Sequence, residues 1–173
     1  DRVNAIYEPI SFGGIQGINF KVGGLTVWRD VNDIGNPFVK ETSDHREFLN
    51  WHAAQNHDKH CLSYVFTFRD FDESTQGLAY ACYLCTTRKA TEADQSYNTG
   101  MISFRSNGNE VPEKIRHLTL AHELGHSLGS NHDQQFLASG KRESEEYPDC
   151  YTDGETGHFI MHEYANTGNS PNN

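Results

Sequence analysis

The chain has 173 residues, 35% of them hydrophobic, and its 24 acidic and 14 basic side chains give a formal net charge of −10. This length is typical of one domain with a continuous core. The acidic balance argues against nucleic acid or an anionic membrane as a partner. No apolar run approaches the roughly 18 residues that a membrane-spanning helix needs, so no membrane segment is expected in this sequence.

The first half of the chain contains signals for two strands and a helix. Apolar alternation around a Gly-Gly pair predicts a strand with a bend over 18–28. A helix is predicted over 44–57, because Asp44 can cap its first turn and Glu47 follows three residues later. A nearly unbroken apolar run then predicts a central strand over 61–68.

The second half adds two predicted strands, at 77–85 and 99–106, and a second helix. This helix begins near Pro112, which tolerates the first helical position because its missing N–H is not needed there. Its core-facing residues recur at three-residue spacing: Ile115, Leu118, Ala121 and Leu124. The order strand, helix, strand, strand, strand, helix predicts an α/β sandwich with a mixed, mostly parallel sheet and an antiparallel edge strand.

The predicted second helix contains the sequence HELGHSLGSNH, which begins at His122. On a helix, His122 and His126 lie one turn apart, so both imidazoles project from one face and can reach one ion. Glu123 lies one position round the helix and can touch a water on that ion. His132 supplies a third ligand when the chain turns sharply after the helix, and Gly129 stands where that turn needs a positive φ. The sequence therefore predicts a catalytic zinc site with an open fourth position.

This set of residues suits the hydrolysis of a peptide bond. Zinc lowers the pKa of a bound water from about 15.7 toward 7, and Glu123 would accept its proton as general base and deliver it to the leaving amine. The alternative is a pair of surface histidines, since a bare H-E-x-x-H also arises by chance. His132 and Gly129 argue against a thermolysin-type enzyme, whose third ligand is a distant glutamate.

Two further groups of side chains are of types that bind metal ions, but their spacing does not suit a metal site. Histidines on the helix over 44–57 and just beyond it do not line up on one helical face, which predicts a solvated polar face: His45, His52, His57 and His60. Acidic residues near the C-terminus lack the glycine and spacing of an EF-hand, which predicts a solvated loop: Glu143, Glu145, Glu146, Asp149 and Asp153.

Four cysteines form an even set that allows three internal pairings: Cys61, Cys82, Cys85 and Cys150. Cys82 and Cys85 make a C-x-x-C, a pattern found in redox and zinc motifs, but no second C-x-x-C supplies the other half of a structural zinc site. Disulfides in an oxidising, extracellular compartment are therefore predicted.

The extended histidine motif resembles that of the metzincin (zincin-like) zinc proteases, whose other mark is a methionine turn beneath the metal. Met161 in HFIMHEYA stands at a suitable distance after His132, and Asp133 is the residue that adamalysins have after the third histidine. The stretches FLNWHAAQNHDKHCLSYVFTFRDFD, GLAYA, YNTGMISF and HELGHSLGSNHD are similar to the catalytic domain of the disintegrin-and-metalloproteinase family. They most resemble its kuzbanian branch, which comprises membrane-anchored sheddases that act as α-secretase and cut Notch-type receptors.

The resemblance implies roles for residues outside the histidine motif. Gly77, Leu78 and Ala79 would form the edge strand to which an extended peptide adds by main-chain hydrogen bonds. Tyr164 and Ala165 would wall the S1′ pocket for an apolar side chain. Ordinary packing stays open as the alternative for Leu78 and Tyr164.

The chain departs from the family at both ends. Family domains have a strand and most of a helix before the region that matches 1–12, and a further helix after the methionine turn. Cys61, Cys85 and Cys150 match family positions whose disulfide partners lie in those flanks. Cys82 has no family counterpart. We expect one catalytic domain over 1–173, with a flexible tail at 166–173, that is either incomplete at both ends or a short form with re-paired cysteines.

The function predicted from the residues and the resemblance together is that of a zinc-dependent metalloendopeptidase with one catalytic Zn²⁺. The resemblance implies an ectodomain sheddase of cell-surface proteins that acts on extended peptide segments, outside the cell or at its surface. A membrane anchor in a longer precursor stays open. The alternative is a catalytically silent, truncated form that acts as a binding or decoy module.

Overall fold

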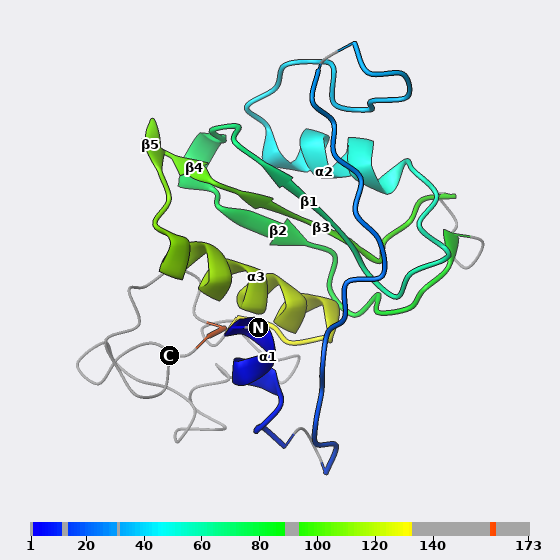
Figure 1. Ribbon diagram of the computed structural model, residues 1–173, viewed down its shortest axis with the longest axis vertical. Helices are drawn as coiled ribbons and strands as arrows, with labels where there is room; N and C mark the ends of the chain where they lie inside the picture. Colours follow the sequence, from blue (N-terminus) through cyan, green and yellow to red (C-terminus); the bar gives the residue numbers. More distant parts are fainter. Residues whose placement is uncertain (1, 12–13, 31, 89–93, 133–159, 162–173) are drawn as a thin grey trace, which may run out of the picture.

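The computed structural model of the protein describes residues 2–11, 14–30, 32–88, 94–132 and 160–161. A three-stranded sheet forms its centre (Figure 1), with the strands β1 (Ser63–Thr67), β2 (Gly77–Ala79) and β3 (Thr99–Ser103). The spatial order is β1-β3-β2, with β1 parallel and β2 antiparallel to β3. The predicted α/β class, with a mixed sheet and an antiparallel edge strand, is confirmed.

Helices lie on both sides of this sheet. Figure 1 shows α2 (His45–Ala53) on one side and α3 (Glu113–Ser127) on the other, with α1 (Arg2–Tyr7) against α3 on the side away from the sheet. The smaller elements are a 3-10 turn, η1 (Asp72–Ser74), and a hairpin of β4 (Arg105–Ser106) and β5 (Asn109–Glu110). Among the described helices, none has the length and apolarity to cross a membrane.

The core consists of two hydrophobic clusters, one on each face of the sheet. The cluster between the sheet and α2 has the buried members Phe48, Leu49, Phe71 and Met101. The cluster between α1 and α3 has the buried members Val3, Tyr7, Ala121 and Leu124, and Tyr64 of β1 packs against it. Strand β3 supplies Met101 to the first of these clusters and is buried along its whole length.

Two helix starts follow the sequence signals closely. The Asp44 carboxylate accepts hydrogen bonds from the backbone N–H groups of Arg46 (2.8 Å) and Glu47 (3.1 Å), so the predicted cap of α2 is confirmed. Pro112 is the N-cap of α3, with ψ 143°, and Glu113 is the first helical residue. The helix that carries the histidines therefore begins one residue after the position that its sequence predicted.

Two expectations about secondary structure are wrong, and one helix was not expected. Residues 18–28 form no strand, and Val22 and Leu25 there are 81% and 82% exposed, because no neighbouring strand in the described chain pairs with them. The strand expected at 77–85 ends at Ala79, since a turn follows. Helix α1 was not anticipated; it is held by packing on α3 and by the Tyr7 hydroxyl, which donates to the carbonyl of Ala121 at 2.5 Å.

The cysteines are arranged differently from what the family resemblance implied. Cys61 and Cys85 form a disulfide with each other, whereas the resemblance placed the partners of both in flanking segments. Cys82 carries a free, exposed thiol. Cys150 lies outside the described residues. The predicted presence of a disulfide is confirmed, and it links the start of β1 to the turn after β2.

The histidines on α2 do not form the solvated face that their spacing predicted. His52 is 7% exposed, and its Nε2 lies 3.1 Å from the carbonyl of Ser63, to which it donates. The His57 ring lies beside it at a tilt of 46°, with 4.4 Å between ring centroids. Burial, and secondarily the nearby His57, lower the pKa of His52 from 6.5 to about 4.

This buried histidine should make the protein sensitive to acid. The pKa of His52 is near 6.5 in the unfolded chain and about 4 in the folded protein. Between these two pH values the unfolded state binds a proton at His52 and the folded state does not. The contribution of His52 to stability should therefore fall as the pH drops from about 6.5 to 4, by roughly 3 kcal/mol. Urea unfolding across this range, with chelator throughout, measures the slope. His52→Gln should flatten it, and an unchanged slope in that variant would contradict the assignment.

Candidate metal centre

The end of α3 is built to bring a third histidine back to the helix. Gly129 adopts φ +101°, and its N–H donates to the carbonyl of His126 at 2.8 Å. The N–H of Ser130 donates to the carbonyl of Gly125 at 2.9 Å. This pair of bonds is a Schellman cap, which favours glycine at the left-handed position. The predicted sharp turn at Gly129 is present.

The turn places three imidazoles together at the C-terminal end of α3. The Nε2 atoms of His122 and His126 lie 3.0 Å apart. The Nε2 of His132 lies 3.1 Å from that of His122 and 3.0 Å from that of His126. All three side chains are half-buried, so they are fixed by the protein while their Nε2 atoms face a common point.

Hydrogen bonds on the other ring nitrogens set the tautomers of two of these histidines. The Nδ1 of His122 lies 2.6 Å from the carbonyl of Ile160, and the Nδ1 of His126 lies 2.8 Å from that of Ser130. A carbonyl only accepts, so each Nδ1 carries the proton and each Nε2 has a free lone pair. Burial also lowers the pKa of His126, which favours the neutral, ligating form.

The donor set fits a zinc ion. Four-coordinate zinc takes imidazole nitrogens at about 2.0–2.1 Å, and two such nitrogens at tetrahedral positions lie about 3.3 Å apart. The observed spacings of 3.0–3.1 Å are close to this value. Neutral imidazoles are also preferred by zinc, and three protein ligands leave the fourth position for a water or substrate.

Glu123 lies beside the histidines in an unusual environment for a carboxylate. It is 5% exposed, and its Oε2 has no hydrogen-bond partner among the described residues. Burial raises its pKa from 4.5 to about 8. A carboxylate held in an apolar site without partners is costly to maintain, and such groups cluster at functional sites. A cation at the neighbouring histidines would favour its ionised form.

The close approach of β2 to α3 depends on a glycine. A Cβ at Gly77 would lie 2.5 Å from Oε1 of Glu123 and 2.8 Å from Cγ2 of Thr119. Gly77 therefore lets the edge strand lie directly over the buried carboxylate. The family resemblance implied a substrate strand here, and the structure adds that this strand and Glu123 are in contact.

Gly77→Ala tests this contact. The new methyl group must displace Glu123 or push β2 outward, so we expect a loss of about 1–3 kcal/mol in stability and a fall in peptidase activity of about 100-fold. Bound metal should be retained, because the three histidines lie on another element. Gly23→Ala is the matched control, since a Cβ there would meet only the His60 ring at 3.4 Å. Wild-type activity in Gly77→Ala would overturn the contact.

Met161 packs beneath the histidines on the underside of α3. It is 8% exposed, and a Cβ at Gly125 would overlap its sulfur atom. The carbonyl of the preceding residue, Ile160, receives the hydrogen bond from His122. The methionine expected near the metal therefore contacts the helix turn between the first two histidines, and Gly125 makes room for it.

The outer edge of β2 is open in the described part of the chain. Leu78 pairs with Met101 of β3, and the flanking bonds join Gln76 to Ser103 and Tyr80 to Thr99. In an antiparallel ladder alternate residues direct their N–H and C=O groups to the partner strand. Gly77 and Ala79 therefore direct theirs away from β3, where an incoming strand could pair with them.

Several contacts at the site were not foreseen. The carbonyls of Ser130 and Ile160 accept from the histidine rings, and the N–H of Cys82 donates to the carbonyl of His126 at 3.0 Å. Gly125 makes room for Met161 against the helix. Only Gly125 left a trace in the sequence, as a small residue inside the motif. Three residues predicted to act at this site lie outside the described part of the chain: Asp133, Tyr164 and Ala165. The acidic residues predicted to form a solvated loop (143–153) and the tail at 166–173 also lie outside it.

Comparison with known proteins agrees with this geometry. The family model for reprolysin-like metallopeptidases of family M12B matches residues 1–173. The chain belongs to this family. Membership confirms the predicted enzyme class, a metalloendopeptidase, and implies that its substrates are peptides or proteins.

This M12B domain is similar to several disintegrin and metalloproteinase domain-containing proteins. It is 35% identical over 193 residues to the disintegrin and metalloproteinase domain-containing protein 10 homolog of Caenorhabditis elegans. It is 36% identical over 183 residues to disintegrin and metalloproteinase domain-containing protein 10 of Xenopus laevis, and 35% identical over 182 residues to the same protein of Homo sapiens. Each comparison covers 99% of the chain but only 20–24% of the relative. The predicted resemblance to the disintegrin-and-metalloproteinase family is confirmed.

Proposed function

We propose that this M12B domain is a zinc endopeptidase in which His122, His126 and His132 hold the metal and Glu123 is the general base. The observation that supports this most is the convergence of three Nε2 atoms within 3.1 Å of one another beside a buried carboxylate without a partner. Structural zinc sites usually have four protein ligands, whereas three leave a position for chemistry.

The residues divide the reaction between them. Zn²⁺ in this site supplies Lewis acidity, which lowers the pKa of water and stabilises negative charge on the scissile carbonyl. Glu123 accepts a proton from the attacking water and then donates it to the nitrogen of the leaving amine. The His122 and His126 rings are oriented for ligation by the carbonyls of Ile160 and Ser130.

The substrate would bind as an added strand on the open edge of β2. The outward N–H and C=O groups of Gly77 and Ala79 would pair with an extended peptide. Because Gly77 lies against Glu123, this pairing would set the scissile bond near the base. Tyr164 and Ala165 remain proposed walls of an S1′ pocket for an apolar side chain.

We further propose that the physiological substrates are ectodomains of membrane proteins, including Notch-type receptors, cut outside the cell or at its surface. Support comes from the 35–36% identity to disintegrin and metalloproteinase domain-containing protein 10 of two vertebrates. The Cys61–Cys85 disulfide adds support, because disulfides persist in oxidising, extracellular compartments.

Hydrolysis of a quenched peptide with an apolar P1′ residue tests the proposal. Activity should be lost when a chelator removes the metal and should return with added Zn²⁺. A folded, zinc-loaded protein that cleaves no peptide would refute the enzyme and favour a silent binding module.

A further inference from the structure

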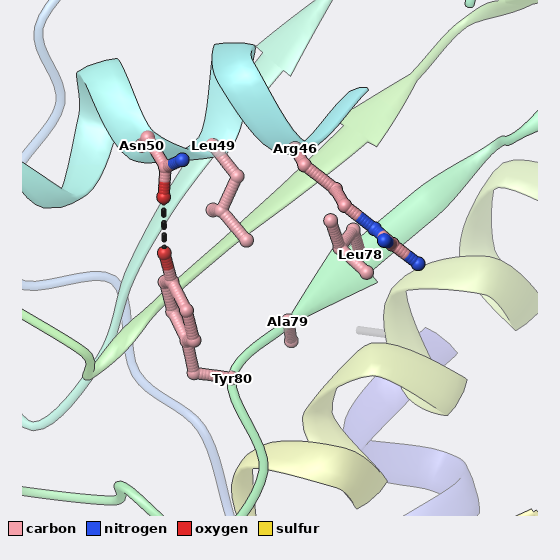
Figure 2. Close-up of a pocket in the computed structure, with 6 residues that line it drawn as sticks. All are labelled: Arg46, Leu49, Asn50, Leu78, Ala79 and Tyr80. Carbon is pink, nitrogen blue, oxygen red and sulfur yellow. Dashed lines mark hydrogen bonds between the residues drawn. The ribbon is translucent and has the colours of Figure 1, made fainter. Parts of the chain in front are cut away.

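A pocket lies on the face of β2 that points away from the histidines. It has a volume of about 270 Å³ between β2 and α2, and its lining residues are Arg46, Leu49, Asn50, Leu78, Ala79 and Tyr80 (Figure 2). Leu49 and Leu78 supply apolar surface. Figure 2 shows Tyr80 joined to Asn50 on one side, through a hydroxyl–amide hydrogen bond of 2.7 Å, and Arg46 on the other side.

The alternation along β2 connects this pocket to a bound peptide. A Cβ at Gly77 would point at α3, whereas the Leu78 side chain packs in the cluster beneath α2. Neighbouring residues on paired strands direct their side chains to the same face of a sheet. The peptide residue that lies beside Leu78 would therefore direct its side chain into the pocket, while the residues before and after it face the histidines.

The charged groups around the pocket leave Arg46 available to a ligand. No carboxylate in the described segments forms an ion pair with the Arg46 guanidinium, although the chain has a net charge of −10. Of the two nearest acidic residues in sequence, Asp44 caps α2, and the pKa of its carboxyl is lowered mainly by the backbone N–H groups of Glu47 and Arg46 and least by the charge of Arg46. Glu47 accepts a hydrogen bond from the Thr42 hydroxyl at 2.6 Å. The amide oxygen of Asn50 is occupied by Tyr80.

We propose that this pocket is a specificity site that selects glutamate at the substrate position beside Leu78. The two methylenes of glutamate suit the apolar surface of Leu49 and Leu78, and its carboxylate would meet the guanidinium of Arg46, which favours planar, bidentate pairing. Lysine at this position is rejected by like charge. This inference rests on the proposed addition of substrate to β2, and it makes Arg46 a determinant of which peptides are cut.

Three series of peptides test the site. All three series start from one parent peptide, and the series differ in the residue that is introduced: Glu, Gln or Lys. Within a series, this residue is placed at one position at a time, on both sides of the cleaved bond. The measurement is kcat/KM for wild type, Arg46→Glu and Lys59→Glu. Lys59 is exposed and is not part of the pocket, so its variant controls for the same change in net charge.

At one position wild type should prefer Glu over Lys by about tenfold, Arg46→Glu should invert the preference, and Lys59→Glu should keep it. A Glu-to-Lys ratio that changes equally in both variants at every position would overturn the proposal. A protein that cuts none of the peptides would refute the proposed function instead. A binding measurement tests the pocket independently of cleavage. Fluorescence anisotropy follows the binding of the same peptides to zinc-loaded Glu123→Gln, with and without the additional Arg46→Glu substitution. Loss of the preference for Glu peptides in the double variant supports the proposed pocket, and an unchanged preference refutes the proposed pocket.

Discussion

Glu123→Gln is expected to lower kcat/KM for peptide hydrolysis by about 1,000-fold or more while zinc content stays unchanged. General acid–base catalysis typically contributes about 10²–10⁴-fold, and a thousandfold loss corresponds to about 4 kcal/mol of transition-state stabilisation. Glutamine has nearly the shape of glutamate but cannot accept the proton of water at neutral pH. Steady-state kinetics together with metal analysis of the same samples measure both quantities.

The matched control for this variant is Glu113→Gln. Glu113 is the first residue of the same helix, is exposed, and forms a surface ion pair with Arg2 at 3.6 Å, so its replacement should leave hydrolysis near wild type. Comparable activity of Glu123→Gln and Glu113→Gln would refute Glu123 as the base.

A stability measurement gives a second readout of the Glu123 environment. With metal removed, the pKa of Glu123 is about 8 in the folded protein and near 4.5 in the unfolded chain. The folded state then binds the extra proton, so this group makes stability fall as the pH rises from 4.5 to 8. Glu123→Gln should remove that contribution and should gain stability relative to wild type above pH 8.

His132→Ala is expected to remove zinc from the protein during dialysis and to abolish hydrolysis. Loss of a mere hydrogen-bonding partner of a zinc ligand typically costs about 10- to 100-fold in affinity, so loss of a ligand should cost more. The two helix histidines would remain oriented by Ile160 and Ser130, which restricts the effect to one donor. Equilibrium competition with a chromophoric chelator measures the affinity.

His60→Ala serves as the control for this second prediction, because His60 is exposed and lies outside the histidine cluster. It should bind zinc as wild type does. Wild-type zinc affinity in His132→Ala would mean that the metal is held by two histidines and a different third ligand.

The parts of the fold that the sequence predicted are those governed by local chemistry. The Asp44 cap and the position of Pro112 marked the starts of α2 and α3, because capping depends on residues within one turn. The segment 18–28 was misassigned, since alternation alone cannot supply a partner strand. Helix α1 has only six residues and depends on packing against α3, which the local sequence does not encode.

The candidate site follows the same division. The spacing of His122, His126 and His132 predicted a shared ligand position because a helix and a glycine turn have fixed geometry. The burial of Glu123 and its contact with Gly77 arise from the approach of β2, which lies more than forty residues earlier in the chain. No local sequence pattern indicates that two segments so far apart in the chain are in contact. The sequence therefore could not predict the burial of Glu123 or its contact with Gly77.

The three-residue length of β2 also bears on which bonds in a substrate can be cut. A peptide segment can pair with Gly77 and Ala79 only when its own N–H and C=O groups are unpaired, so a segment inside a helix or sheet must first open locally. The free energy of that opening belongs to the substrate and lowers the rate of cleavage by the fraction of time the segment stays closed. Cleavage would therefore concentrate in linkers and loosened segments, and a mutation that stabilises the substrate could protect it without touching the protease.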